Sequence, residues 1–439
     1  MRESEPNINS VSKSLYTGQP DPELWRHYLT SARWFQGKGL PVGDIRITPL
    51  PWYGTRGSVA VRSEFAQVSL GDRVETYHLL VGYLPAGRGE PAARVGRIGQ
   101  GRHAVDIVDA PRSPRAMRTL LGALTRPHAT GVTWYGSPVD PDSPTQVFTG
   151  EQSNTTVRIG ESHLLKIFRK LVPGANLEAE TMAALAPSPI IPQLLGTWSA
   201  TSDERYDLGV FVERIDKARD GWAFCVEAGT ANRSVASEMT ALGRTLRTLH
   251  ADLARAYGVS VVDSATISHR FLDGLGTAST EVPELAARRD TLATVLRLPP
   301  GDTPVQRVHG DFHLGQALLA PRGWTIIDFE GEPLKTPAER AAPDAVWRDV
   351  AGLTRSLDYA RATAHASEQW YAEARAAFLS GYSEVPVPSP LLAAYETDKA
   401  IYELVYEVRN RPDWAAIPRQ ALDTTSIPMK PSPAGPSLG

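Results

Sequence analysis

Alternating apolar and polar residues dominate the first quarter of the chain. The stretches DIRITPL, SVAVRSEFAQVSL and VETYHLLVGYL are rich in β-branched and aromatic residues, and glycine-containing turns separate them. A period of two is typical of strands in a half-buried sheet. The pattern predicts a small antiparallel sheet. We expect a helix before it, near residues 20–29, and a Pro/Gly/Arg-rich loop after it, at 85–102.

After about residue 104, helical and extended segments alternate. A period near 3.6 residues predicts helices at Pro114–Leu124 and Leu177–Leu185. Short β-branched runs predict strands around Val147 and at Thr155–Ile159, His163–Phe168, Leu194–Trp198 and Leu208–Val212. This order indicates a second β-rich unit that ends near residue 213.

Helical periodicity dominates the remainder. It predicts helices at Thr230–Tyr257, Asp344–Tyr359, His365–Tyr382 and Pro390–Val408, with short strands inside Val305–Asp328. We therefore divide the chain into an N-terminal cap subdomain at 1–103, an intermediate β-rich subdomain at 104–213 and a helical lobe at 214–427. The Pro/Ser/Gly-rich tail at 428–439 is predicted to be disordered.

Composition narrows the class of protein. Acids and bases are spread through 439 residues with a net charge of −3, which argues against a nucleic-acid-binding protein because such proteins carry a basic face. No apolar run is long enough to cross a membrane, and the N-terminal sequence lacks the apolar core of a secretory signal. The one cysteine, Cys225, excludes an internal disulfide and a cysteine-based zinc site. We expect a cytoplasmic protein without an obligate protein partner.

The strongest chemical signal lies between residues 309 and 330. The segment HGDFHLGQ contains Asp311 and, five residues later, Gln316; the segment IIDFE places Asp328 directly after an apolar strand. A carboxylate can deprotonate an attacking hydroxyl. A second carboxylate and an amide oxygen suit Mg²⁺, which prefers hard oxygen ligands. The set predicts phosphoryl transfer from MgATP, with Asp311 as the base.

This spacing is similar to that of the catalytic loop of protein kinases. HGD stands in place of HRD, Gln316 in place of the kinase asparagine, and DFE in place of DFG. A kinase also needs a lysine on a strand with a glutamate partner on a helix. Lys166 lies in the apolar run LLKIF of a chain with only eight lysines, and the following helix offers Glu178 and Glu180. We favour Glu180 as the partner.

Two further segments are expected to contact the nucleotide. The loop GEQSNTT at 150–156 stands where kinases cover the phosphates, and its Ser153, Asn154 and Thr155 can offer hydroxyls, an amide and backbone N–H groups. It lacks the GxGxxG pattern, so alone it is a weak signal. The segment VFVERI, which contains Glu213, stands where a hinge would bind adenine.

Several motifs resemble one family of small-molecule kinases. GEQSNTTV, LLKIFRK, VHGDFHLGQALL, IIDFEGEP, RDVAG and YELVYEVRNRPDW resemble the actinobacterial maltokinases and glucosamine kinases, which belong to the aminoglycoside-phosphotransferase-like kinases. The resemblance runs from about Trp25 to Pro418. It implies an α+β, bilobal, eukaryotic-protein-kinase-like fold with a β-rich cap and a helical C-lobe. It also implies MgATP as donor, Asp311 as base, Gln316 and Asp328 as metal ligands with Glu330 as an additional one, and phosphate contact by Lys166.

The acceptor is harder to identify. Maltokinases phosphorylate the anomeric hydroxyl of a disaccharide, and glucosamine kinases phosphorylate the 6-hydroxyl of an aminosugar. If the segment through Val408 is helical, Glu403 and Glu407 share one face, followed by Asp413 and Trp414. An acidic pocket beside an indole favours glucosamine over maltose, because an ammonium group needs carboxylates. Alternatively, the two glutamates pair with Arg409 and Arg411. We assign His313 to the acceptor site as well.

We also consider two hypotheses from other classes of protein. One is a catalytically inactive kinase-fold module that only binds nucleotide. The presence of Lys166, Asp311, Gln316 and Asp328 argues against it. The other is a protein kinase, which would need an activation loop ending in an APE-like anchor. The sequence after DFEGEP instead continues into AERAAPDAVWRDV.

Overall fold

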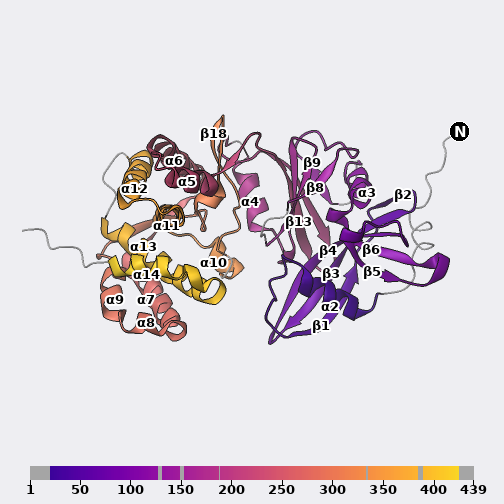
Figure 1. Ribbon diagram of the computed structural model, residues 1–439, viewed down its shortest axis with the longest axis horizontal. Coiled ribbons are helices and arrows are strands. Elements are labelled where there is room, and N and C mark those ends of the chain that lie inside the picture. Colours follow the sequence, from indigo (N-terminus) through magenta and orange to yellow (C-terminus); the bar gives the residue numbers. More distant parts are fainter. Residues whose placement is uncertain are drawn as a thin grey trace, which may run out of the picture. The chain divides into compact units, whose positions relative to one another are not determined.

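The structure is a computed structural model that describes residues 20–126, 131–148, 153–186, 188–332, 335–383 and 389–424. It contains two compact units (Figure 1). Unit 1 comprises Met1–Ala186 and Pro192–Asp216, and unit 2 comprises Pro187–Ile191 and Lys217–Gly439. The predicted disordered tail lies outside the described residues.

Unit 1 begins with helix α2 and a seven-stranded sheet in the order β1-β3-β4-β6-β5, in which β2 pairs with β3 and β11 with β4. The elements are α2 Pro22–Ser31, β1 Val42–Pro49, β2 Gly54–Arg56, β3 Val59–Leu70, β4 Arg73–Pro85, β5 Arg94–Ile98, β6 Val105–Asp109 and β11 Lys170–Leu171. Asp21 caps α2, whose Trp25 and Leu29 are buried against the sheet. The sheet therefore extends beyond residue 103, because β6 and β11 belong to it.

A six-stranded sheet completes unit 1, in the order β7-β12-β13-β10-β9-β8. Its strands are β7 Val132–Trp134, β8 Thr145–Val147, β9 Thr155–Ile159, β10 His163–Ile167, β12 Leu194–Thr201 and β13 Arg205–Glu213. The helices of this part are α3 Pro114–Leu124 and α4 Leu177–Ala184. All of these strand pairs are antiparallel.

Unit 2 is mainly helical. Its longer helices are α5 Gly221–Thr230, α6 Ala236–Tyr257, α7 Ser264–Glu281, α9 Arg289–Leu296, α11 Trp347–Ala364, α12 Glu368–Tyr382, α13 Ser389–Asn410 and α14 Ala416–Thr424, and its short ones are α8 Pro283–Ala286 and α10 Pro337–Ala341. Two small sheets accompany them: β14 Arg219–Asp220 with β17 Ala317–Ala320 and β18 Gly323–Ile326, and β15 Val259–Asp263 with β16 Asp302–Gln306. Helices α11 and α13 pack side by side (Figure 1).

One predicted helix is divided in the structure. We expected a single helix over Thr230–Tyr257, but α5 ends at Thr230 and α6 begins at Ala236. Asn232 has a φ of 48°, in the left-handed region that ends helices. Arg233 N donates to Ala228 O at 2.8 Å and closes the turn. The break is local, because α6 then continues to Tyr257 as predicted.

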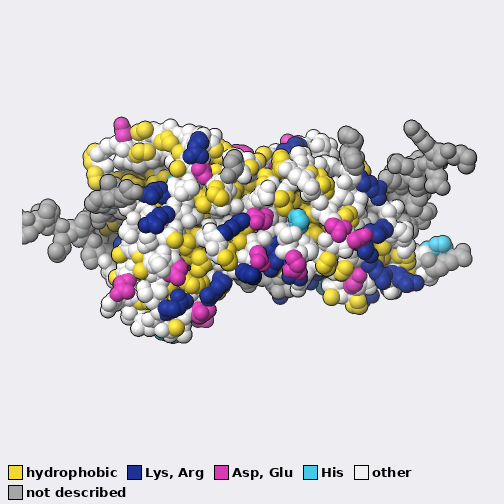
Figure 2. Space-filling model, turned by 90° about the horizontal axis from the view of Figure 1, so that it is seen from above, with side chains coloured by type: hydrophobic (Ala, Val, Ile, Leu, Met, Phe, Trp, Pro, Cys, Tyr) yellow, Lys and Arg dark blue, Asp and Glu magenta, His cyan; other side chains and the backbone are white. Residues whose placement is uncertain are grey.

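Surface charge agrees with the composition. Figure 2 shows one face of the molecule, on which basic and acidic side chains are interspersed rather than separated into fields of one sign. A nucleic-acid-binding face would be expected to collect the basic side chains in one stripe. Among the described residues, no helix combines the length and the apolar character that a bilayer crossing requires.

Candidate active site

The loop that carries Asp311 is anchored by a buried carboxylate on α11. Asp349 accepts hydrogen bonds from His309 N and Gly310 N, each at 2.8 Å, and its side chain is fully buried. His250 Nε2 lies 2.9 Å from the same carboxylate. Burial raises the pKa of Asp349, but the contacts with His250 outweigh this and hold the pKa below its usual value. Asp349 therefore stays ionised and fixes the backbone beside the predicted base.

Close packing at a glycine also fixes this loop. A Cβ atom on Gly352 of α11 would lie 2.4 Å from Phe312 O, so only glycine lets the helix approach the loop this closely. Gly310 has a φ of 85°, a conformation that glycine adopts without strain. The RDVAG motif is thus a support for the HGDF loop.

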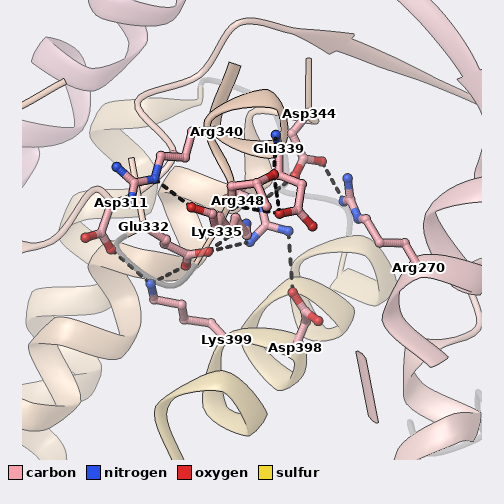
Figure 3. A network of polar contacts seen from close by, with 12 residues as sticks. Arg270, Asp311, Glu332, Lys335, Glu339, Arg340, Asp344, Arg348, Asp398 and Lys399 are labelled. Carbon is pink, nitrogen blue, oxygen red and sulfur yellow. Dashed lines mark hydrogen bonds and ion pairs between the residues drawn. The ribbon is translucent and has the colours of Figure 1, made fainter. Parts of the chain in front are cut away.

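Asp311 is 19% exposed at its side chain and contacts a lysine from α13 (Figure 3). Lys399 Nζ lies 3.1 Å from Asp311 Oδ1 and 2.6 Å from Glu332 Oε1. The accessible carboxylate at the end of a rigid loop meets the requirement for a general base.

The two strongest metal-ligand candidates lie together at the end of the β17–β18 hairpin. Gln316 Nε2 donates to Asp328 Oδ2 at 3.1 Å. Gln316 ends the short 3₁₀ turn Leu314–Gln316 before β17, and Asp328 follows β18 by two residues, so the hairpin brings them side by side. Asp328 has a φ of 68°, which is strained for an aspartate and is a feature often found at functional sites.

His313 determines which end of the Gln316 amide can serve a metal ion. His313 Nδ1 accepts from Gly315 N at 3.0 Å, so the proton of the neutral ring is on Nε2. Burial lowers the pKa of His313, which keeps the ring neutral. The amide nitrogen of Gln316 lies 3.3 Å from His313 Nε2 and 3.1 Å from Asp328 Oδ2. A half-turn of the amide would let His313 donate to its oxygen and present two oxygens to one cation. The residues therefore fit Mg²⁺.

Glu330 lies in the same region. Carboxylate oxygens of Asp328 and Glu330 are within 4.8 Å of each other, a separation that one ion can bridge. These ligands are all hard oxygens, and no thiolate is offered, because the one cysteine is buried elsewhere, in α5.

In unit 1, Lys166 forms an ion pair with a helix glutamate. Lys166 Nζ lies 2.6 Å from Glu178 Oε2, and both side chains are largely buried. We had favoured Glu180, and the structure corrects that choice to Glu178, two positions earlier. Glu178 lies in the first turn of α4, two positions after the cap Asn176, and its carboxylate contacts Lys166 of β10. The lysine–glutamate pair itself is present, as the motif requires.

Two residues of the predicted phosphate loop bind an arginine. Asn154 Oδ1 accepts from Arg169 N at 3.0 Å, and Thr155 Oγ1 accepts from Arg169 Nε at 2.8 Å. Arg169 is fully buried and also contacts Asp109 at 3.1 Å. Ser153 is exposed, and the preceding residues 149–152 lie outside the described residues. These side chains thus hold the base of the loop in place.

Glu213 ends β13 in the predicted hinge. Its backbone N donates to Gln193 O at 2.9 Å, and its carboxylate accepts from Gln193 N at 3.4 Å. Whether this segment binds adenine stays a prediction.

Arginines already pair with both glutamates of the predicted acceptor pocket. Arg355 Nη2 of α11 lies 2.9 Å from Glu403 Oε2, and Arg411 Nη2 lies 2.8 Å from Glu407 Oε1. Burial raises the pKa of Glu403, although Arg355 opposes the rise. The alternative interpretation, in which arginines pair with these glutamates, is thus correct for Arg411. For Arg409 it is wrong, because that side chain pairs with Glu281.

Trp414 lies in an aromatic group rather than alone. Its ring stacks on Tyr359 at a centroid distance of 6.1 Å and an interplanar angle of 24°, and the Arg411 guanidinium lies 5.0 Å from its centre. Asp413 is exposed in the short turn Pro412–Trp414. A partly open indole beside a tyrosine is a suitable surface for the apolar face of a sugar ring.

Three residues of this region were not predicted from the sequence to have a role in the site: Asp349, Lys399 and Glu332. Asp349 and Glu332 belong to motifs that we had noted, RDVAG and DFEGEP, without assigning them a role. Lys399 lies 88 positions after Asp311, and no local pattern links the two. Its one signal was its identity as a lysine in a chain that has so few.

Known proteins with similar sequences are kinases of small molecules. Residues 144–391 match the phosphotransferase enzyme family (APH), and residues 28–112 match the maltokinase N-terminal cap domain. A curated glucosamine kinase of Mycolicibacterium smegmatis is 28% identical over 312 residues, which cover 62% of this chain and 77% of that protein. A curated glucosamine kinase of Streptacidiphilus jiangxiensis is 28% identical over 322 residues, covering 62% and 71%.

Solved structures agree at the level of the fold. A glucosamine kinase in complex with glucosamine, ADP and inorganic phosphate is similar with a TM-score of 0.63 at 22% identity, over 93% of this chain and 99% of that one. A second crystal form of a glucosamine kinase has a TM-score of 0.62 at 23% identity, over 92% and 99%. The predicted α+β kinase-like fold with a cap is therefore confirmed.

Proposed function

Since this chain belongs to the phosphotransferase enzyme family and is a kinase that transfers phosphate to a hydroxyl group, we propose that its acceptor is a sugar, D-glucosamine, and its product glucosamine 6-phosphate. The observation that carries the chemistry is the pair of Gln316 and Asp328 at one end of the β17–β18 hairpin, with Asp311 on the loop that precedes this hairpin. The 28% identity with two glucosamine kinases supports the choice of acceptor.

In the proposed reaction Asp311 orients the acceptor hydroxyl and takes its proton as the oxygen attacks the γ-phosphate of ATP. Gln316 and Asp328, with Glu330 beside them, would hold Mg²⁺, which neutralises charge on the phosphate oxygens. With the Gln316 amide turned so that its oxygen faces His313, the neutral His313 would hold that oxygen through its Nε2–H. Asp349 keeps the loop backbone fixed, so that the carboxylate does not need to reorganise during the transfer.

In unit 1 we propose that Lys166 contacts the phosphates of the nucleotide, with Glu178 orienting its ammonium group. The pair is largely buried, so the lysine has little freedom to turn away. Asn154 and Thr155 are held by Arg169, and we therefore expect this loop to bind phosphate through backbone N–H groups. Glu213 and its neighbours are proposed as the hinge that receives adenine.

Maltose is the second candidate, and specific observations favour it. Arg355 and Arg411 already neutralise Glu403 and Glu407, so neither carboxylate is free to attract the ammonium group of glucosamine. The match of residues 28–112 to the maltokinase cap domain points the same way. A neutral disaccharide would instead stack a ring on Trp414, which Tyr359 supports from within.

An acceptor panel tests the proposal. We expect purified protein with MgATP to phosphorylate D-glucosamine at the 6-hydroxyl, with much weaker turnover of N-acetylglucosamine, glucose and maltose. ADP release measures the rate, and phosphorus–proton NMR of the product locates the phosphate. Strong turnover of maltose to the 1-phosphate without turnover of glucosamine would replace our acceptor and leave the kinase chemistry intact.

A further inference from the structure

A largely buried lysine on α13 contacts the predicted base, and no step of the reaction described above uses it. Lys399 is 12% exposed at its side chain, and its Nζ lies 3.1 Å from Asp311 Oδ1 and 2.6 Å from Glu332 Oε1 (Figure 3). It comes from a helix that begins 78 positions after the base, so the contact forms only in the folded unit. A cation that contacts the carboxylate of the predicted base can influence where that carboxylate lies.

The lysine is held firmly in this place. Glu332 is 1% exposed at its side chain, and Lys335 Nζ lies 2.6 Å from its other oxygen. Burial lowers the pKa of Lys399, but Glu332 and Asp311 outweigh it and raise the pKa above its usual value, so the ammonium form persists. If Lys399 turned away, it would leave Glu332 with one ion-pair partner fewer in a buried position.

The contact with Lys399 makes the two carboxylate oxygens of Asp311 different from each other. Oδ1 accepts from Lys399, whereas Oδ2 accepts no hydrogen bond from any residue that the structure describes. A carboxylate held at one oxygen cannot rotate freely about its terminal bond. The other oxygen then has a fixed direction in which it can accept a proton.

We propose that Lys399 is a positioning residue for the phosphoryl transfer. It fixes Asp311 through Oδ1, so that Oδ2 accepts the proton of the acceptor hydroxyl, and Glu332 holds the lysine in place. As the proton moves to Oδ2, the hydroxyl oxygen bonds to the γ-phosphorus and the bond to the β-phosphate oxygen breaks, with its electron pair leaving on ADP. This role rests on the proposed function of Asp311 as the base.

Lys399→Met tests the role, with Lys335→Met as the matched control. Both variants remove a lysine that pairs with Glu332, but only Lys399 contacts Asp311. We expect Lys399→Met to lower kcat about 10²-fold with little change in the KM for ATP, since a mispositioned group of this kind costs about that factor. Lys335→Met should keep kcat within about threefold of the wild type, because the base stays fixed.

A double-mutant cycle separates positioning from a general structural role. In an Asp311→Asn background, Lys399→Met should lower kcat by less than about threefold, because the group that it positions is gone. An equal loss in both backgrounds would overturn the proposal. If Lys399→Met does not fold by circular dichroism, Glu332→Gln replaces it, and an unchanged kcat in that variant would also contradict the role. A wild-type protein that phosphorylates no sugar would instead refute the proposed function itself.

Discussion

At the scale of single residues, buried charges in unit 2 are arranged so that each has an opposite partner. Asp344 is 5% exposed; Arg270 Nη2 lies 2.8 Å from its Oδ1, and Arg348 also pairs with it (Figure 3). The Tyr395 hydroxyl donates to the same carboxylate at 2.6 Å. Burial raises the pKa of Asp344, but the two arginines outweigh it and hold the pKa below its usual value. The carboxylate is therefore ionised in the folded protein at all ordinary pH values.

This depressed pKa predicts how stability changes with pH. The unfolded chain binds a proton at Asp344 below about pH 3.9, whereas the folded chain does not, so the stabilisation is complete above that pH and is lost as the pH falls towards the folded pKa. Asp344→Asn should cost about 3–5 kcal/mol at pH 7, because it breaks a buried ion pair. The difference from wild type should shrink below about pH 4.

Hydrogen exchange of α11 and α13 peptides at several urea concentrations would measure this free energy within unit 2. A difference between wild type and Asp344→Asn that grows as the pH falls would contradict the predicted sign. Two-state analysis of the whole chain is less suitable, because the protein has two compact units.

At the scale of secondary-structure elements, α11 supports the catalytic loop by a close backbone contact. Gly352 faces Phe312 O, and Asp349 one turn earlier binds the backbone of the same loop. Helix and loop therefore form one rigid element, in which the helix supplies both a charge and the space for the loop.

Gly352→Ala tests that contact. The added methyl group would lie 2.4 Å from Phe312 O, so the loop must move. We expect a loss of about 1–3 kcal/mol in stability, with kcat reduced by about tenfold or more because Asp311 shifts with the loop.

Gly276→Ala in α7 is the matched control for this substitution. A Cβ there would meet no described atom within 4 Å, so alanine should stabilise the helix by about 0.5–1 kcal/mol. Thermal unfolding and steady-state turnover measure both variants. Equal behaviour of the two would show that the close approach at Gly352 has no effect.

At the scale of the whole molecule, contacts that are local in sequence could be predicted and distant ones could not. Gln316 and Asp328 lie 12 positions apart at the two ends of one hairpin, so their spacing alone brings them together. The lysine–glutamate pair was predicted, but Glu178 and Glu180 lie only two positions apart, and helix phase relative to the sheet decides between them. Glu403 pairs with Arg355, 48 positions away, through the packing of α11 on α13, which no local pattern reports.

For the fold as well, features that depend on local sequence were predicted better than features that depend on distant contacts. Most strands and helices that were predicted from periodicity match the structure to within a few residues, and α3 has the predicted bounds. Helices α7 and α9 were not predicted. The break before α6 was missed because it depends on the backbone conformation of Asn232 rather than on hydrophobic periodicity. The extension of the first sheet by β11 was missed as well, because that strand is only two residues long and pairs with β4 across some 90 positions.

If Asp311 is the base of a phosphoryl transfer, Asp311→Asn removes the group that accepts the proton and should slow the reaction sharply. The measurement is kcat for phosphorylation of D-glucosamine, or of the best acceptor from the panel, at saturating MgATP, with circular dichroism to confirm the fold. We expect a normal fold and a kcat lower by about 10²–10⁴-fold, the usual size of a general-base contribution. A folded Asp311→Asn protein that keeps nearly full activity would show that Asp311 is not the base.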